Sequence, residues 1–141
     1  MTMRLVPYLV MDGNSKEAIQ FYEQALDAKL LFMQTFEQMP ENPDFPLSAD
    51  LKDRVGHAML KVGETDLMLS DTFPGQPHQT GDQVTICIVI KDKEKSKKIY
   101  EALKQDGQVI MELQETHFSP SYGSLKDKFG ITFQIFTEEQ R

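Results

Sequence analysis

The sequence contains one cysteine and no tryptophan, and it has no apolar run that approaches the ~18 residues of a membrane span. Cys87 alone cannot form a disulfide bond within the chain, which is typical of a reducing compartment. The first residues lack the length and the small-residue cleavage site of a signal peptide. These absences together favour a cytoplasmic protein.

Basic residues are in the minority, with 15 Lys and Arg against 22 Asp and Glu, so the net charge is -7. A surface of this sign repels phosphate backbones and anionic lipid head groups. The one basic stretch, 91–98, is interleaved with acidic residues and is typical of a solvated helix face. We therefore expect neither nucleic acid nor a membrane as a partner.

The chain of 141 residues has the length of one ordinary domain. Apolar residues at helical spacing predict a helix over 15–26, started by a capping box at Asn14, and a second helix that Asp92 caps and Gly107 ends. The proline-rich stretch 37–54 is expected to be a long loop or flap. Strands are predicted over 5–11, 29–36, 56–62, 65–71, 83–90, 109–113, 122–126 and 131–136.

The order strand, helix and three strands therefore occurs twice, in modules of about 1–72 and 82–137. Two stretches support a duplication, because 10–12 matches 90–92 and the turn 61–65 matches 128–132. The predicted fold class is α+β, with two βαβββ modules in one domain over 1–141. Such a module leaves one face of its sheet uncovered, and two modules together can enclose a cavity.

Three groups of residues, in order along the chain, carry a family resemblance. They are Pro7-Tyr8-Leu9 with Gly13-Asn14, Glu17-Ala18 and Phe21-Tyr22, then His57-Ala58-Met59-Leu60 with Met68-Leu69-Ser70-Asp71, and finally Leu113-Gln114-Glu115-Thr116 with Tyr122-Gly123 and Asp127-Lys128-Phe129-Gly130. The set resembles the PhnB-like branch of the glyoxalase / bleomycin-resistance / extradiol dioxygenase superfamily, also called the vicinal oxygen chelate superfamily. The resemblance covers nearly the whole chain, and it implies a cupped mixed sheet and a homodimer. The branch usually has an aromatic residue, often Trp, where this sequence has His117.

Metal-using members of that superfamily bind their ion with His or carboxylate ligands from the first and last strands of each module. Counting from the matched stretches transfers these positions to Leu5, Thr85, Leu67 and Gln134. Two leucines, a threonine and a glutamine do not offer the donors that a divalent ion requires. We therefore predict a protein without a metal site and without another cofactor.

Alternation along the predicted strands places Leu67, Leu69, Thr85, Cys87 and Gln134 on the face that lines the cup. This largely apolar set suits the binding of a small, partly apolar molecule, and it suits a filled core equally well. The stretches 37–54 and 114–122 are expected to cover it. Gln134 and Thr85 need hydrogen-bond partners, which a ligand, a water molecule or each other can supply.

Three further residues are candidates for catalysis. His57 is expected to lie across from Ser70, which fits an activated nucleophile and also fits a hydrogen-bonded structural histidine. Glu115 and His117 lie in a predicted loop, where they suit a general base and acid or ordinary surface groups.

Three functions agree with these patterns. The first, which we favour, is a metal-independent small-molecule-binding protein, of the sequestering kind seen among antibiotic-resistance relatives. The second is a metal-dependent lyase or isomerase that acts on a small oxygenated substrate, with a non-standard ligand set such as His57, Glu115 or His117. The third is a dimeric scaffold whose cup is filled by its own side chains. The identity of the ligand and the presence of any catalytic activity stay open.

Overall fold

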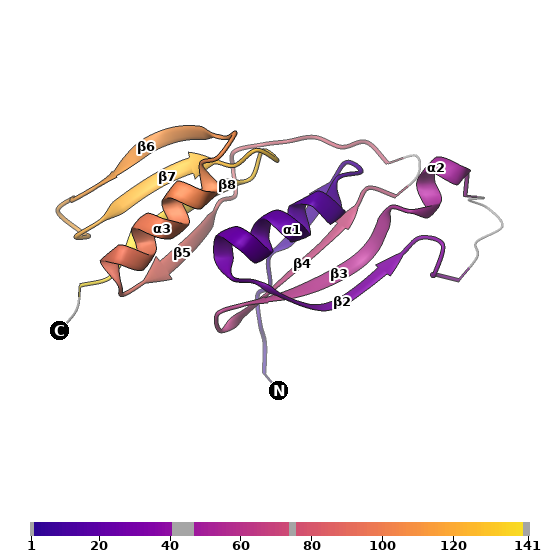
Figure 1. Cartoon of the computed structure of the whole chain (residues 1–141), viewed down its shortest axis with the longest axis horizontal. Coiled ribbons are helices and arrows are strands. Elements are labelled where there is room, and N and C mark those ends of the chain that lie inside the picture. Colours follow the sequence, from indigo (N-terminus) through magenta and orange to yellow (C-terminus); the bar gives the residue numbers. More distant parts are fainter. Residues whose placement is uncertain (1, 41–46, 74–75, 140–141) are drawn as a thin grey trace. The chain divides into compact units, whose positions relative to one another are not determined.

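The computed structural model describes residues 2–40, 47–73 and 76–139, and the chain divides into two compact units, 1–79 and 80–141. Each unit has one four-stranded sheet with a long helix against one face (Figure 1). The elements of the first unit are β1 (Tyr8–Met11), α1 (Ser15–Leu26), β2 (Lys29–Thr35), α2 (Ala49–Lys52), β3 (Val55–Val62) and β4 (Thr65–Asp71). Those of the second are β5 (Ile86–Ile90), α3 (Lys93–Leu103), β6 (Gln108–Gln114), β7 (Tyr122–Lys126) and β8 (Thr132–Thr137).

Both sheets have the same topology. The strand orders are β1-β4-β3-β2 and β5-β8-β7-β6, and in each sheet the first strand runs parallel to the last while the other pairs are antiparallel. This confirms the predicted α+β class with two βαβββ modules. The first strand starts at Tyr8 rather than at residue 5, because Pro7 has no N–H and contributes only its carbonyl, which accepts from Met68 N. None of the helices among the described residues is long and apolar enough to cross a membrane.

The stretch 37–54, expected to be a loop, contains the short helix α2 and is joined to the sheet at its base. Phe36 N donates to Arg54 O at 2.9 Å, and Glu37 N donates to Lys52 O at 3.1 Å. The buried ring of Phe36 stacks on Phe73, with 5.3 Å between the ring centroids. Residues 41–46 lie outside the described part of the chain. The described ends of this stretch therefore continue the β2–β3 pairing beyond the predicted strand.

The core of each unit lies between its long helix and one face of its sheet. In the first unit α1, which has the predicted bounds, buries the apolar stripe that predicted it. The strand residues that face the helix are all buried: Leu9, Met11, Ala58, Leu60, Leu67 and Leu69. In the second unit the corresponding core contains Ile99, Tyr100, Leu103, Leu125, Phe133 and Ile135.

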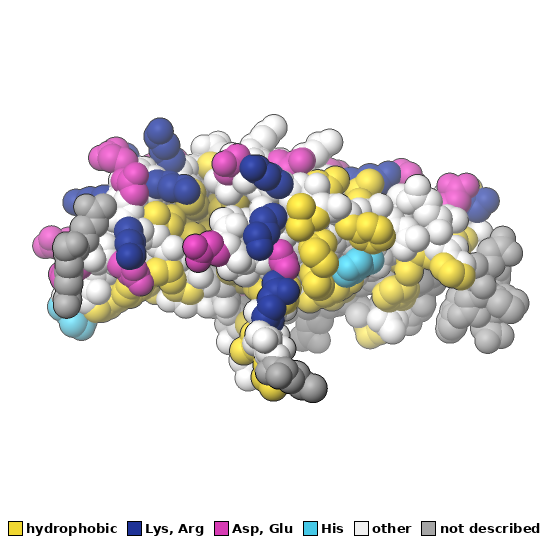
Figure 2. Space-filling model, turned by 90° about the horizontal axis from the view of Figure 1, so that it is seen from below, with side chains coloured by type: hydrophobic (Ala, Val, Ile, Leu, Met, Phe, Trp, Pro, Cys, Tyr) yellow, Lys and Arg dark blue, Asp and Glu magenta, His cyan; other side chains and the backbone are white. Residues whose placement is uncertain are grey.

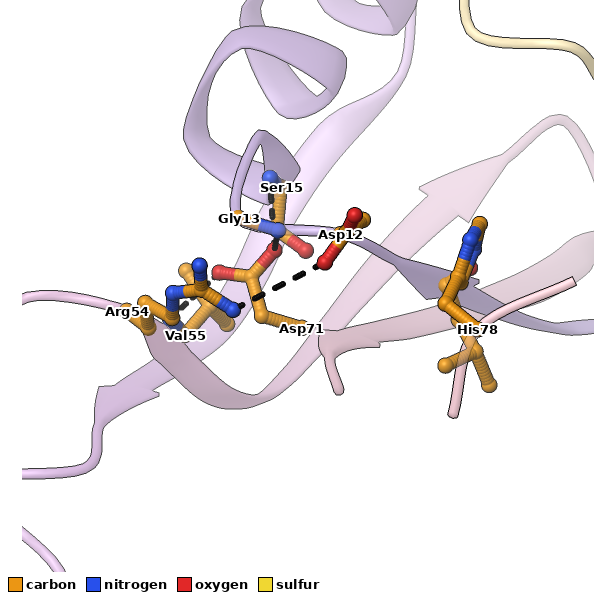
Figure 3. A network of polar contacts seen from close by, with 8 residues as sticks. Asp12, Gly13, Ser15, Arg54, Val55, Asp71 and His78 are labelled. Atoms are coloured by element: carbon orange, nitrogen blue, oxygen red, sulfur yellow. Dashed lines mark hydrogen bonds and ion pairs between the residues drawn. The ribbon is translucent and has the colours of Figure 1, made fainter. Parts of the chain in front are cut away.

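The start of α1 is held by an aspartate from a distant strand. The capping box predicted at Asn14 is wrong, because the Asn14 side chain makes no cap hydrogen bond. Asp71 at the end of β4 instead accepts from Gly13 N at 2.9 Å and from Ser15 N at 3.0 Å through Oδ1, and from Val55 N at 2.9 Å through Oδ2 (Figure 3). A carboxylate at this position also interacts favourably with the helix dipole. One side chain therefore joins β4, α1 and β3.

The second unit starts its helix in a different way. Asp92 caps α3 as predicted, and its Oδ1 accepts from Glu94 N at 3.0 Å. At the strand end that corresponds to Asp71, the hydroxyl oxygen of Thr137 lies 2.7 Å from Ser96 Oγ on α3. A neutral hydroxyl pair thus stands where the first unit has a buried carboxylate.

The strand registers relate the two units residue by residue. The last pair of the parallel ladder is Met11–Asp71 in one sheet and Ile90–Thr137 in the other. The turn between β3 and β4 contains two residues, 63–64, whereas five residues, 127–131, separate the paired ends of β7 and β8. The sequence analysis aligned these two turns, and the alignment is therefore wrong by one residue along β4 and β8. Counting from the ladders, the matching residues are Met68 with Gln134, His57 with Tyr122, and Gln34 with Gln114.

Substitution of Asp71 tests its role as the junction of three elements. Asp71→Ala leaves three backbone N–H groups without acceptors, and each unpaired group costs about 1–3 kcal/mol. We expect the free energy of unfolding, measured by urea denaturation, to fall by about 3 kcal/mol or more. The control is Asp12→Ala, which removes an exposed carboxylate 3.9 Å from Arg54 and should change it by less than about 0.5 kcal/mol. Equal losses in the two variants would contradict this role.

Candidate functional site

In the described structure, each sheet has a second face with no helix packed on it, which we call the open face of that unit (Figure 1). Side chains that alternate with the core residues lie on it. Several are large, apolar and exposed, among them Tyr8 and Val10 in the first unit and Val89 in the second. Figure 2 shows hydrophobic side chains gathered beside a histidine on one side of the molecule. Exposed apolar surface of this kind marks a site of binding or association.

The predicted ligand-binding face is wrong for Leu67 and Leu69. These side chains are 5% and 0% exposed, and they pack in the core on the α1 side of the sheet. They alternate in β4 with Met68, which lies on the open face. The error arose because the register was counted through two turns of unequal length, which shifted it by one residue along the last strand. Thr85 and Gln134 lie on the open face of the second unit, and so does Cys87, which is exposed.

Gln134 is the centre of a hydrogen-bonded chain on that face. Its Nε2 donates to Thr85 Oγ1 at 2.8 Å, and its Oε1 accepts from the Tyr122 hydroxyl at 2.5 Å. The three side chains come from β8, from the residue just before β5, and from β7. Thr85 and Gln134 therefore partner each other, and Tyr122, which was not predicted as a site residue, is the third member. All three are half-buried, so solvent reaches the chain.

Aromatic rings border the Gln134 chain. Phe118, in the loop between β6 and β7, stacks on Phe136 with 6.0 Å between centroids and an interplanar angle of 15°. It also meets Tyr122 edge-on at 5.0 Å, and His117 meets Phe118 edge-on at 5.1 Å. Phe118 is 48% exposed, so this cluster presents an accessible ring next to the polar chain. Phe118, and not the neighbouring His117, is the ring that contacts Tyr122 and Phe136.

The loop that carries Phe118 is fixed by two buried serines. Ser119 Oγ donates to Thr137 O at 2.6 Å, and Ser121 N donates to Ser119 Oγ at 3.2 Å. On the other side of the loop, Thr116 N donates to Ser119 O at 2.9 Å. The Phe118 ring therefore sits on an ordered loop that is joined to the end of β8.

His57 lies on the open face of the first unit, at the position that matches Tyr122. Its Nδ1 is 3.1 Å from the Tyr8 hydroxyl, and the two rings stack with 5.8 Å between centroids. Phe32 lies on another side, 5.9 Å away. When the phenol donates to Nδ1, the proton of the neutral imidazole resides on Nε2. His57 is therefore a hydrogen-bonded histidine, and in that tautomer its second nitrogen is a donor.

The residues near His57 do not form a nucleophilic site. Ser70 is buried, and the neighbouring Asp71 is already engaged by three backbone N–H groups. Glu115 is exposed in the loop after β6, with no hydrogen bond to the Gln134 chain among the described contacts. The described geometry assembles no catalytic dyad or triad from these residues.

The positions of the superfamily's metal ligands can also be transferred with the observed strand register, and the residues found there do not suit a divalent ion. Leu5 precedes β1, and the residue that matches Thr85 is Val6, while Met68 matches Gln134. None of these side chains is an imidazole, a thiolate or a carboxylate. Among residues 2–40, 47–73 and 76–139, no three His, Cys, Asp or Glu side chains are grouped in a way that could hold a metal ion.

Two surface hollows border α3 rather than the open face. One, of about 310 Å³, lies at the start of the helix beside Pro120, and the other, of about 440 Å³, lies along the helix beside Leu113. Lysines and glutamates alternate along both, and Lys104 is paired with Glu101 at 2.9 Å. Their mixed charge does not select a ligand of either sign.

The chain belongs to the glyoxalase/bleomycin resistance protein/dioxygenase superfamily, whose family model matches residues 4–135. Protein YjdN of Escherichia coli (strain K12) is 30% identical over 146 residues, which cover 99% of this chain and 98% of that protein. The crystal structure of protein PA1353 from Pseudomonas aeruginosa has 33% identity and a TM-score of 0.88, and the match covers 99% of this chain and 100% of that one. A putative 3-demethylubiquinone-9 3-methyltransferase, PhnB protein, from Bacillus cereus shares the fold, with 21% identity, a TM-score of 0.77 and coverage of 96% and 99%.

Cys87 allows the open face of the second unit to be probed without labels. Partial burial raises the pKa of the Cys87 thiol, because the thiolate loses hydration. Since the thiolate is the reactive form, we expect the rate of DTNB labelling to reach half its maximum at a higher pH in the native protein than in urea. Stopped-flow absorbance measures both profiles, with Cys87→Ser as the blank. A native midpoint at or below the unfolded one would contradict the partial burial of this thiol.

Proposed function

We propose that this protein binds a small molecule on the open face of its second unit, without a metal ion. The observation that carries the proposal is the Thr85–Gln134–Tyr122 chain beside the exposed ring of Phe118. Small-molecule sites combine an apolar and aromatic lining with a few polar groups that fix orientation. Cys87 lies next to Gln134 in the β5–β8 pairing and completes the proposed site. The single thiol is consistent with a cytoplasmic protein.

Stability of the fold does not explain this arrangement. The hydrophobic core lies on the other face of the sheet, and an exposed ring such as Phe118 gains little from burial. A polar chain on that open face is also accessible to water, so its hydrogen bonds add little to folding. Side chains that contribute little to stability, and that are held in place by an ordered loop, are typical of a binding surface.

The role of Gln134 can be measured with any ligand found in a thermal-shift screen, where the stabilisation follows RT ln(1 + [L]/Kd). Gln134→Leu removes the central hydrogen bonds, and we expect the ligand to bind about tenfold more weakly, or about 1.4 kcal/mol. The free energy of unfolding should change by no more than about 1 kcal/mol, because water reaches both former partners. Isothermal titration calorimetry and urea denaturation measure the two quantities.

The matched control is Gln105→Leu, which changes an exposed glutamine bonded to Glu101 O after α3. We expect this variant to bind the ligand as the unsubstituted protein does. Unchanged affinity in Gln134→Leu would remove Gln134 from the site.

The alternative function is the metal-dependent lyase or isomerase with a ligand set drawn from His57, Glu115 and His117. The absence of a suitable group of donors among the described residues favours the metal-free proposal. Elemental analysis of protein purified without added metal separates the two. About one Zn, Ni or Fe per chain, lost on chelation, would favour the alternative.

We also propose that the protein forms a homodimer through an edge strand. β1 is one edge strand of the first sheet, and on it His78 Nε2 already lies 2.9 Å from Val10 O. The other edge strand of the first sheet, β2, exposes four consecutive large apolar side chains: Leu30, Leu31, Phe32 and Met33. An exposed apolar edge of this kind pairs with another chain unless it is protected.

Light scattering at high micromolar concentration is expected to give twice the chain mass of 16.2 kDa. Leu31→Lys places a charge in the middle of this edge and should shift the protein towards monomer, whereas Val84→Lys, at an exposed position before β5, should not. A monomeric mass for the unsubstituted protein would rule out the dimer.

A further inference from the structure

We infer that the open face of the second unit binds an uncharged aromatic molecule with a carbonyl oxygen beside its ring, such as an aryl ketone or an aromatic amide. The inference rests on the proposed function and adds the chemical class of the ligand. Three features of the face support it: the neutrality of its polar centre, the unused hydrogen-bond donors there, and the exposed ring next to it.

The polar centre of the face has no free charge to offer. Gln134, Thr85 and Tyr122 are uncharged at neutral pH, and the lysine on the same face, Lys126, is paired with Asp82 Oδ1 at 2.8 Å. A carboxylate or phosphate that moved onto this face would lose hydration without gaining a cation, and an ammonium group would gain no carboxylate. The ligand group that meets Gln134 is therefore uncharged.

The hydrogen-bonded chain has unused donors. Gln134 Nε2 uses one of its two N–H groups on Thr85, and Thr85 accepts that bond, so its own hydroxyl proton is unused in the described contacts. Thr132, two residues before Gln134 in β8, has a buried hydroxyl oxygen with no partner among the described residues. The Gln134 amide and the hydroxyls of Thr85 and Thr132 therefore all have hydrogen-bond donors that no described contact uses. An oxygen acceptor with two lone pairs, such as a carbonyl, can receive both the Gln134 N–H and the Thr85 O–H.

The ring cluster selects a flat partner. Phe118, Phe136 and Tyr122 already contact one another at centroid distances of 5.0–6.4 Å, and Phe118 leaves one side accessible. Aromatic rings pair in offset-stacked or edge-on arrangements, so a ligand ring extends the cluster. Because the bonds of Ser119 fix the loop, binding does not have to order it.

The test uses three probes that differ in one property each: acetophenone, benzoate and cyclohexyl methyl ketone. Benzoate replaces the neutral carbonyl by an anion, and the cyclohexyl ketone replaces the flat ring by a saturated one. The readout is the rate at which DTNB labels Cys87, whose strand position pairs with Gln134. We expect acetophenone to slow labelling in a saturable way, and the other two probes to need at least tenfold higher concentrations for the same protection.

Two variants locate the effect, each compared with its own labelling rate without probe. Thr85→Val removes a donor and keeps the side-chain shape, and Phe118→Leu removes the accessible ring. Each should raise the acetophenone concentration for half-protection at least fivefold. The control is Phe73→Leu, which changes an exposed phenylalanine of the first unit and should leave this concentration unchanged.

The outcomes separate the ligand class from the binding function. Equal protection by benzoate or by the cyclohexyl ketone, or unchanged half-protection in both Thr85→Val and Phe118→Leu, would overturn the ligand class while the binding function stands. Protection only by a chemically different compound from the thermal-shift screen would do the same. If neither the three probes nor any screened compound changes labelling or melting temperature, the proposed function itself fails.

Discussion

The buried carboxylate of Asp71 is the interaction on which the first unit depends. A carboxylate in a protein interior is costly unless its oxygens accept hydrogen bonds, and here three backbone N–H groups supply them. The same bonds fix where α1 starts relative to β3 and β4. Because the helix is held against one face of the sheet, the residues that alternate with the core residues are left on the other. The Asp71 junction therefore helps to determine which face of the first sheet stays open.

The second unit reaches the same topology with different chemistry. A pair of hydroxyl groups, Ser96 and Thr137, stands in place of the carboxylate, and Asp92 caps the helix locally. On the open face, a histidine in one unit corresponds to a tyrosine in the other, His57 and Tyr122. The duplication has thus kept the backbone pairing while the polar groups diverged. This divergence is the reason that the two faces offer different hydrogen bonds.

Much of the fold could be predicted from the sequence because its signals are local. The bounds of α1, β4 and β7 follow from apolar periodicity and adjacent turn residues, and Asp92 acts within its own helix start. The bonds of Asp71 could not be predicted, because its acceptor atoms and the Ser15 N–H are 56 residues apart in the chain. The sequence pattern favoured Asn14 as a local cap, but Asp71 from a distant strand accepts the hydrogen bond from Ser15 N instead.

The site shows the same division between local and distant signals. Alternation alone places Thr85, Cys87 and Gln134 on one face, but it failed for Leu67 and Leu69 because the register was counted through turns of unequal length. A shift of one residue moves every side chain of a strand to the opposite face. Phe118 and Tyr122 could not be predicted as part of the site, because only the folded loop brings their rings together. Counting from the ends of the parallel ladders would have corrected the register, but that requires knowledge of the pairing.

The attachment of the Phe118 loop has a consequence for how such proteins diversify. Ser119 anchors the loop to the backbone of Thr137, and the side chain of Thr137 in turn contacts α3 through Ser96. Anchoring and recognition are thus assigned to neighbouring but separate residues. A substitution at position 118 changes the ring of the proposed site, whereas a substitution at 119 removes the bond that holds the loop to Thr137. The ring of the proposed site can therefore be exchanged without any change to the residues that anchor its loop.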